Sequence, residues 1–529
     1  MLKKMKAMKN VINQFGEIPK IKYKPGDMEA IKSYHGYRVK NSLDPFVVDD
    51  ITWNDLNMDD VFKRINMGLS TSGEQYLYHQ LRQPTVSEDD FNSRKGLIDA
   101  IEQDTDLRIK LHKILYKLGK NNKAKLAEVF EPGSRSASKL VLYMILSLGF
   151  VFSAVATIIS LNNILALAFF AIVNSVVREV MRKKIYTDIE TVNYSVSMVF
   201  AANKIRKLSS HKLDHHTNEM YKELSQLGVI LRVGGVSVTS GSDVGDLFSN
   251  WLLLDLITYE IIKNKIGTHY HSIFKIHESL GKIEAALAVS SYRKSVPEHS
   301  IPRIVFESNK TPYLQGEALI HPLVKTCVSN NLMMNKSHLV TGSNASGKST
   351  FLKTAAINAI MGQAICTVLA KTYDATAFRI YSSMALSDNL LSGESYYISE
   401  IKSLKRIVEA TRSGHAIMCV IDEVLRGTNT VERIAASSEI LKAIADENTL
   451  CLVATHDVEL CRLLEEQYEM VHFQEDFSGD TMIFDYKMKT GEAKSRNAIK
   501  LLRILGFDEQ ISNAANERAM NYLSQGVWK

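Results

Sequence analysis

The sequence predicts a mainly α-helical region in its N-terminal part and an α/β domain in its C-terminal part. Three observations lead to this fold class. A glycine-rich loop lies between an apolar strand and a helix at 341–350, two further apolar strands end in polar residues near 422 and 455, and an uncharged run fills 140–177. The chain of 529 residues is long enough for two to four domains, each with its own core.

Composition leaves the class of partner open. The formal net charge of +6 permits contact with DNA or anionic lipid, but it is below the basic excess that would argue for either. The N-terminus, MLKKMKAMKN, has no apolar segment after it, which argues against secretion. The five cysteines form no C-x-x-C pair, so we expect reduced core thiols rather than disulfides or a metal centre.

The helical region is expected in several parts. Residues 1–36 form a basic N-terminal segment, and 37–135 form the first part of a helical core, because apolar residues recur there at i, i+3 and i+4. Residues 185–303 form its second part. This part includes the apolar run 247–267, which charged residues interrupt and which we interpret as a core helix. Residues 304–529 then form the α/β domain.

Between the two helical parts, the uncharged run predicts a transmembrane helical hairpin over 136–184. Its first half, Leu140–Leu161, has 22 residues and would rise about 33 Å as a helix, against a hydrocarbon core of about 30 Å. Asn162-Asn163 is a turn signal, and the second half reaches Met181. Basic residues flank only the outer ends, which places both ends in the cytoplasm and the membrane contact at 140–181. The alternative is a hairpin buried in a soluble assembly or a dimer interface.

A phosphate-binding loop follows the apolar pair Leu339-Val340. It fits G-x-x-x-x-G-K-[ST] at every defined position, between a short strand and a helix. In such loops backbone N–H groups surround the phosphates, the lysine reaches the β- and γ-phosphates and the hydroxyl coordinates Mg²⁺. The expected nucleotide-binding residues are Gly342, Ser343, Asn344, Ala345, Ser346, Gly347, Lys348, Ser349 and Thr350.

Two later strands end in residues that, together with the phosphate-binding loop, predict a nucleoside triphosphatase. The first ends in Asp422-Glu423, where Asp422 is expected to hold Mg²⁺ and Glu423 to activate the attacking water. The second, TLCLVATHDVEL, ends at His456, which we expect to sense the γ-phosphate. This order of loop, carboxylate strand and histidine strand recurs in ATPases of the ABC type. The expected cofactors are therefore ATP and Mg²⁺.

The segments SDNLLSGESYYISEIKSLKRIVEAT, IDEVLRGTNTVERIAASSEILKAI and LVATHDVEL resemble the ATPase domain of the MutS family of DNA mismatch-repair proteins. The resemblance covers roughly 304–525 and is weaker in the helical core upstream. It implies an ABC-type P-loop fold, a C-terminal helical dimerisation element and a homodimer with composite ATP sites. Ser395 lies where the family has the serine that contacts the nucleotide of the partner subunit. The resemblance also implies DNA as a partner.

The N-terminal part departs from that family. We expect the mismatch-reading and connector domains to be absent, and Phe15-Gly16-Glu17 matches the family's F-x-E motif in letters only. The hairpin enters about where the family's lever helices leave the core. The leading hypothesis is a membrane-associated dimeric ATPase, related to mismatch repair, with its ATPase domain in the cytoplasm. The alternative is a membrane-tethered mechanochemical ATPase with a non-DNA partner. An ABC transporter subunit is disfavoured, because no LSGGQ-like signature appears.

Overall fold

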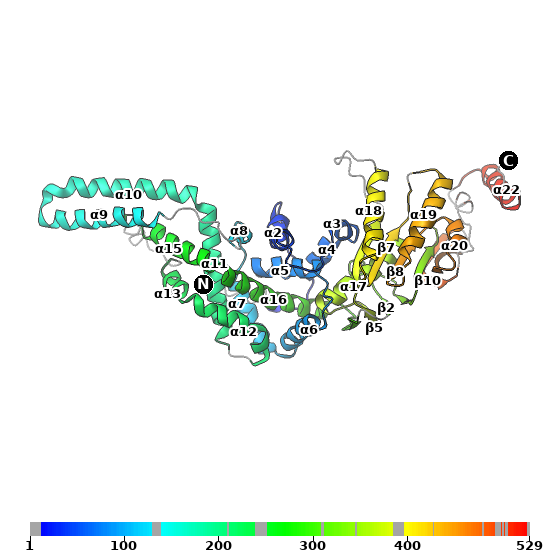
Figure 1. Cartoon of the computed structure of the whole chain (residues 1–529), viewed down its shortest axis with the longest axis horizontal. Helices are drawn as coiled ribbons and strands as arrows, with labels where there is room; N and C mark the ends of the chain where they lie inside the picture. Colours follow the sequence, from blue (N-terminus) through cyan, green and yellow to red (C-terminus); the bar gives the residue numbers. More distant parts are fainter. Residues whose placement is uncertain are drawn as a thin grey trace. The chain divides into compact units, whose positions relative to one another are not determined.

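The computed structural model divides into two compact units, each described by itself below (Figure 1). Unit 1 comprises Met1–Pro45, Phe62–Leu81 and Asn92–Ser295, and unit 2 comprises Phe46–Val61, Arg82–Phe91 and Val296–Lys529. The residues that the structure describes are 12–129, 139–208, 211–237, 251–307, 311–343, 346–384, 396–426, 428–478, 481–491, 499, 502 and 506–525.

The described residues of unit 1 form helices and the loops that connect them, with no strand. Helix α16 is its centre, since almost every side chain from Ser272 to Arg293 is buried. Helices α7, α11 and α12 pack against it. The helices of this unit, three of which extend a few residues into unit 2, are α2 (Asp27–Lys40), α4 (Met58–Ile65), α5 (Thr71–Arg82), α6 (Glu88–Gln103), α7 (Thr105–Leu118), α8 (Leu126–Val129), α9 (Leu140–Ile159), η1 (Leu161–Asn163), α10 (Ile164–Lys184), α11 (Tyr186–Arg206), α12 (His211–Gln226), α13 (Gly228–Ser237), α15 (Leu254–Thr268) and α16 (Tyr270–Ser295).

A buried carboxylate on α16 fixes the start of α5. Glu284 accepts hydrogen bonds from the N–H groups of Leu69 and Ser70, both at 3.0 Å, and from Ser70 Oγ at 2.5 Å. These donors stand just before or at the helix start, where N–H groups have no partner within the helix. Burial raises the pKa of Glu284 to about 7, although the bonds from Ser70 and Leu69 oppose this shift. Glu284 therefore acts as a cap for α5 supplied by a distant segment.

Helices α9 and α10 form the expected hairpin and lie side by side, turning at η1 (Figure 1). Among the described residues, the segments Leu140–Ile159 and Leu161–Met181 are long and apolar enough to cross a membrane. Only 17% and 6% of their apolar windows are buried in the protein. Side chains near the turn are the most exposed, at 86% for Ile158 and 80% for Leu165. The hairpin thus presents an apolar surface that the described part of unit 1 leaves uncovered.

The base of the hairpin is fastened to α15. The buried Asn174 side chain donates to the carbonyl of Leu146 at 3.2 Å and to that of Trp251 at 2.6 Å. Arg178 pairs with Asp255 at 2.8 Å. Tyr143, Leu253 and Leu256 form a small core with hairpin residues around these contacts. The apolar run 247–267, where described, therefore packs as a helix on the hairpin instead of forming a third candidate span.

Unit 2 contains two sheets. The larger has the strand order β10-β9-β4-β8-β7-β6, parallel except for the β9–β10 pair, and the smaller has the order β1-β5-β2-β3. The elements are α3 (Asp50–Asp55), β1 (Arg303–Val305), β2 (Leu314–Leu319), β3 (Asn330–Met334), β4 (Ser337–Thr341), α17 (Lys348–Ile365), β5 (Thr372–Thr376), β6 (Arg379–Met384), α18 (Tyr396–Thr411), β7 (Ile417–Asp422), α19 (Thr430–Ile444), β8 (Thr449–Ala454), α20 (Val458–Leu463), β9 (Tyr468–Ser478), β10 (Thr481–Thr490) and α22 (Glu509–Gln525).

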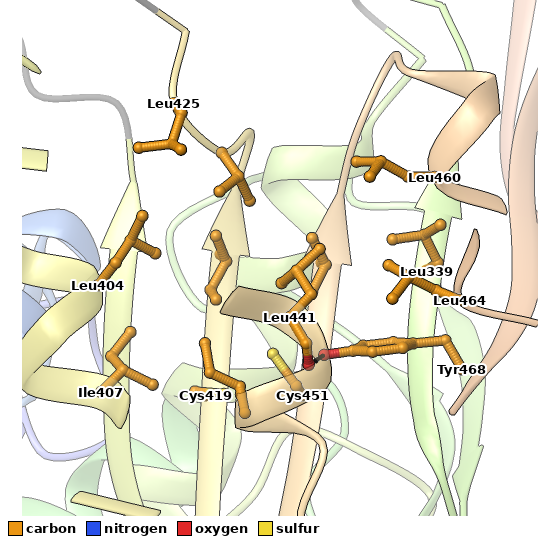
Figure 2. Close-up of a cluster of buried hydrophobic side chains, with 14 of the residues drawn as sticks. Leu339, Leu404, Ile407, Cys419, Leu425, Leu441, Cys451, Leu460, Leu464 and Tyr468 are labelled. Atoms are coloured by element: carbon orange, nitrogen blue, oxygen red, sulfur yellow. Dashed lines mark hydrogen bonds between the residues drawn. The ribbon is translucent and has the colours of Figure 1, made fainter. Parts of the chain in front are cut away.

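The middle strands of the larger sheet are buried on both faces, which is why β7 and β8 are continuous apolar runs. One face packs against α18, α19 and α20 through alternate strand residues such as Cys419 and Cys451 (Figure 2). Tyr468 donates its hydroxyl to the carbonyl of Leu441 at 2.9 Å, which ties β9 to α19. Helix α17 contacts both sheets. This packing places the ends of β4, β7 and β8 at one edge.

Candidate functional site

The glycine-rich loop connects β4 to α17, as the sequence predicts. Gly347 has φ = 106° and directly precedes the first helical residue, Lys348. Gly342 has φ = 139°, and a Cβ atom there would lie 2.4 Å from the carbonyl oxygen of Phe473. A side chain at Gly342 would therefore meet both backbone strain and a backbone clash. Ser346 is buried and donates its hydroxyl to the carbonyl of Ser343 at 2.8 Å, closing the loop.

Lys348 brings a positive charge into the loop. Its Nζ donates to the carbonyls of Gly342 and Ser343, both at 2.8 Å, and lies 3.4 Å from Nε2 of His456. Lys348 is 5% exposed, and burial lowers its pKa, while Asp422 and Glu423 oppose this shift. A partly desolvated ammonium interacts more strongly with an anion than an exposed one would. The loop therefore provides a positive centre suited to phosphate oxygens.

Glu423 stands beside that charge, one residue after the end of β7. Its φ of 62° is in the left-handed region, and its N–H donates to the carbonyl of Ala454 on β8 at 2.9 Å. Its carboxylate pairs with Arg426 and lies 3.3 Å from Nε2 of His456. Burial raises the pKa of Glu423, but the hydrogen bond and charge of Arg426 outweigh it and lower the pKa overall. Glu423 is therefore ionised near neutral pH.

His456 follows β8 and contacts both Lys348 and Glu423. Burial lowers its pKa, and the nearby Lys348 lowers it further, so the ring is neutral near pH 7. A neutral ring beside Lys348 and Glu423 can donate from one nitrogen and accept at the other. Asp457, the next residue, forms two bonds with Arg433 of α19, at 2.6 and 3.0 Å. This pair holds the turn that carries His456.

These side chains surround one cavity of about 510 Å³ within unit 2. Of the residues expected from the sequence, those that line it are Ser343, Gly347, Lys348, Ser349, Thr350, Asp422, Glu423 and His456. Gly342 and Ser346 shape the loop instead. Asn344, Ala345 and Ser395 lie outside the described residues. Ser349 and Asp422 offer the oxygen donors that Mg²⁺ prefers, so the donor set fits this ion.

Several residues that line this cavity were not among those expected from the sequence. Arg426 pairs with Glu423, and the ring of Tyr486 lies 3.1 Å from where a Cβ of Gly347 would be. Tyr486 has φ = 52° at an irregularity of the β9–β10 pairing. Asn330 holds it there by donating to the Tyr486 carbonyl at 2.9 Å. Arg426 lies in the segment IDEVLRGTNT, which resembles the MutS family. No sequence pattern predicts Tyr486 at this site, because β10 reaches the loop only in the folded sheet.

Comparison with known proteins agrees with this geometry. Residues 338–523 match the model of MutS domain V, the ATPase domain of that family. DNA mismatch repair protein MutS of Bacillus velezensis is 26% identical over 278 residues, which are 50% of this chain and 31% of that protein. DNA mismatch repair protein MSH3 of Phaeosphaeria nodorum is 26% identical over 277 residues, 49% of this chain and 24% of that protein. MutS of Bacillus subtilis is 30% identical over 213 residues, 38% of this chain and 24% of that protein.

The loop, the strand order and the family match define the C-terminal region as a MutS domain V. The chain is a MutS-like family member, related to mismatch-repair proteins. The matched region spans about a third or less of the length of these relatives.

We predict that Gly342→Ala lowers the thermal midpoint of unit 2, because the new Cβ clashes with the Phe473 carbonyl. The expected loss of stability is about 1–3 kcal/mol, the usual cost of such a conformation for a non-glycine residue. Gly414→Ala is the matched control, since Gly414 also has positive φ (72°) but nothing within 4 Å. Equal midpoints for the two variants in a thermal melt would contradict the close approach.

Proposed function

We propose that the chain binds and hydrolyses ATP with Mg²⁺ in the cavity between the loop and the carboxylate strand. The proposal rests on one observation. Nε2 of His456 lies 3.4 Å from Nζ of Lys348 and 3.3 Å from the carboxylate of Glu423, and Ser349 and Asp422 line the same cavity. In this proposal Ser349 and Asp422 hold Mg²⁺, which neutralises charge on the phosphates. Lys348 and the loop N–H groups, with those of Asn344 and Ala345, bind the phosphate oxygens.

Glu423 is the proposed general base. Its carboxylate is ionised near neutral pH, so it can accept a proton from a water that attacks the terminal phosphate. His456 is the proposed sensor of that phosphate, because its ring lies between Lys348 and Glu423. Arg426 pairs with Oε2 of Glu423, and Oε1 lies 3.3 Å from Nε2 of His456.

Tyr486 is the proposed wall for the nucleotide base. It lines the cavity beside the loop, and its ring stacks on Phe484 with 5.7 Å between ring centres. An aromatic face next to a phosphate loop is suited to a planar base. The apolar residues Val324 and Val328 line the same cavity. This arrangement supports the proposal that the cavity binds a whole nucleotide rather than phosphate alone.

We further propose an ABC-type fold and a homodimer. In the larger sheet β8 lies between the loop strand β4 and the carboxylate strand β7, which supports this fold type. The family resemblance implies that Ser395 completes the site of the partner subunit. The likeness to MutS and MSH3 proteins supports DNA as a partner, as an inference by analogy. Full activity would then require two chains.

The hairpin α9–α10 is the proposed membrane anchor, with the ATPase domain in the cytoplasm. Burying one Ile or Leu side chain is worth about 1.5–3 kcal/mol. Ile158, Ile159 and Leu165 are each at least 80% exposed, so insertion of the hairpin into lipid would release several times that amount. The positive residues at the outer ends support a cytoplasmic orientation.

One observation favours the alternative of a membrane ATPase with a non-DNA partner. Helices α9 and α10 lie outside residues 338–523, which match MutS domain V. An ATPase domain can serve different partners when its attached domains differ. The proposal therefore needs a direct test for DNA.

We predict that Glu423→Gln abolishes ATP hydrolysis while nucleotide binding persists, because the amide cannot accept the proton. The expected loss in turnover is at least about 100-fold. Glu432→Gln is the control, since Glu432 lies on α19 and does not line the cavity. Unchanged turnover in the Glu423 variant would remove it from the role of base.

We predict that the chain binds lipid vesicles through the hairpin and rises with them in a flotation assay. Replacing Ile158, Ile159 and Leu165 by serine should move the chain from the vesicle fraction to the soluble one, because these side chains are the most exposed of the hairpin. Met333→Ser is the control, since Met333 is also exposed (63%) but lies in unit 2. A wild-type chain that remains soluble without detergent, as a large assembly, would favour the buried-hairpin alternative.

The partner is tested by the ATPase rate in nanodiscs with homoduplex, mismatched or branched DNA at two salt concentrations. We predict stimulation by at least one DNA form, falling steeply as salt rises, because phosphate contacts release counterions. Basal hydrolysis that responds to none of the three forms would contradict the DNA role and support the non-DNA alternative.

A further inference from the structure

Helix α3 is part of unit 2, although about 240 residues separate it along the chain from the main part of that unit, Val296–Lys529. Its last residue, Asp55, is 8% exposed. Oδ2 of Asp55 accepts hydrogen bonds from Ser382 Oγ at 2.6 Å and from the Met384 N–H at 3.1 Å. Both donors belong to β6, so one carboxylate oxygen fastens the end of this strand.

The contact between Asp55 and β6 lies next to the strand that carries Asp422. Strand β6 is parallel to β7, and Met384 is in register with Asp422. Asp55 therefore holds the residue that lies directly beside the proposed magnesium carboxylate. The Ser382 hydroxyl is buried and the Met384 N–H is partly buried, so both are costly to leave without an acceptor and the end of β6 depends on Asp55.

The first turn of α3 makes a second attachment to the same strand. Asp49 caps the helix by accepting the Thr52 N–H at 2.8 Å, and it pairs with Arg406 of α18. The Ser382 N–H donates to Thr52 Oγ1 at 3.1 Å. Arg406 also donates to the Ser382 carbonyl. Helix α3, β6 and α18 are thus joined by one network of hydrogen bonds.

The end of α3 reaches the other side of the site. Lys353 is on α17, four residues after Ser349, and its Nζ donates to Asn57 Oδ1 at 2.8 Å. Asn57 has φ = 54° and lies two residues after α3. The segment 49–57 therefore contacts the helix that carries the phosphate loop as well as the strand next to the carboxylate strand. It is suited to fix the distance between the two.

We propose that Asp55 is a positioning residue, which fixes Asp422 relative to Ser349 through β6 and so sets the affinity of the site for Mg²⁺. This inference rests on the proposed nucleotide site. Small displacements of a metal ligand weaken coordination strongly, because Mg²⁺ demands near-octahedral geometry.

The test measures binding of a fluorescent ATP analogue to the full chain in nanodiscs, with Mg²⁺ and with EDTA. In the wild type Mg²⁺ should strengthen binding. Asp55→Ala should reduce this enhancement on the order of tenfold, because two hydrogen bonds to β6 are lost, and leave binding in EDTA unchanged. Asp55→Asn should restore it to within about twofold, since an amide oxygen still accepts both bonds.

Asp50→Asn is the matched control, because Asp50 lies on the same helix with its side chain 86% exposed and pairs with Arg82 rather than with β6. Ser382→Ala removes one bond to Asp55 without touching the helix, and it should reduce the Mg²⁺ enhancement in part. If Asp55→Ala does not fold, the Mg²⁺ enhancement of Ser382→Ala tests the positioning role instead.

An Mg²⁺ enhancement that is unchanged in a folded Asp55→Ala or in Ser382→Ala would overturn the positioning role. Failure of the wild type to bind the analogue at all would contradict the proposed nucleotide site itself. A wild type that binds with Mg²⁺ enhancement but does not hydrolyse would contradict only the proposed ATPase activity, and the role of Asp55 would still be decided by binding.

Discussion

The site depends on the contacts that stabilise the buried ammonium group of Lys348. It is held by two loop carbonyls, and the carboxylates of Asp422 and Glu423 offset part of the cost of burying it. Both kinds of partner reach it only because β4, β8 and β7 are adjacent and parallel, so that their carboxyl ends meet at one edge. The apolar packing of α18 and α19 keeps these strands in register (Figure 2).

The same principle, a buried charge satisfied by distant segments, recurs in both units. Glu284 of α16 caps α5 in unit 1, and Asp55 of α3 fastens β6 in unit 2. Glu284 accepts two backbone N–H groups, whereas Asp55 accepts one backbone N–H and one hydroxyl. Such contacts specify one arrangement of segments more strictly than apolar packing does, because a shifted segment leaves a buried donor unsatisfied.

Much of the fold was predictable because its signals are local. The phosphate loop requires glycines at fixed spacing, the inner parallel strands require continuous apolar runs, and the hairpin requires a long uncharged stretch; all three stand in the sequence as contiguous patterns. Asp422 and His456 were predictable for the same reason, since each follows such a strand. Their convergence with Lys348 could only be expected by analogy, because it depends on strand order.

The sequence by itself determined the elements that carry the loop, the carboxylate pair and the histidine, since these depend on residue types at short spacing. Only the tertiary structure decided that Arg426 pairs with Glu423, that Tyr486 lies over Gly347 and that helix α3 packs with the C-terminal unit. Tyr486 and Asp55 are 139 and 293 residues away from Gly347 and Lys348 along the chain. The physical reason is that such contacts arise from sheet register and hydrogen bonds between distant segments, which leave no periodic pattern in the chain.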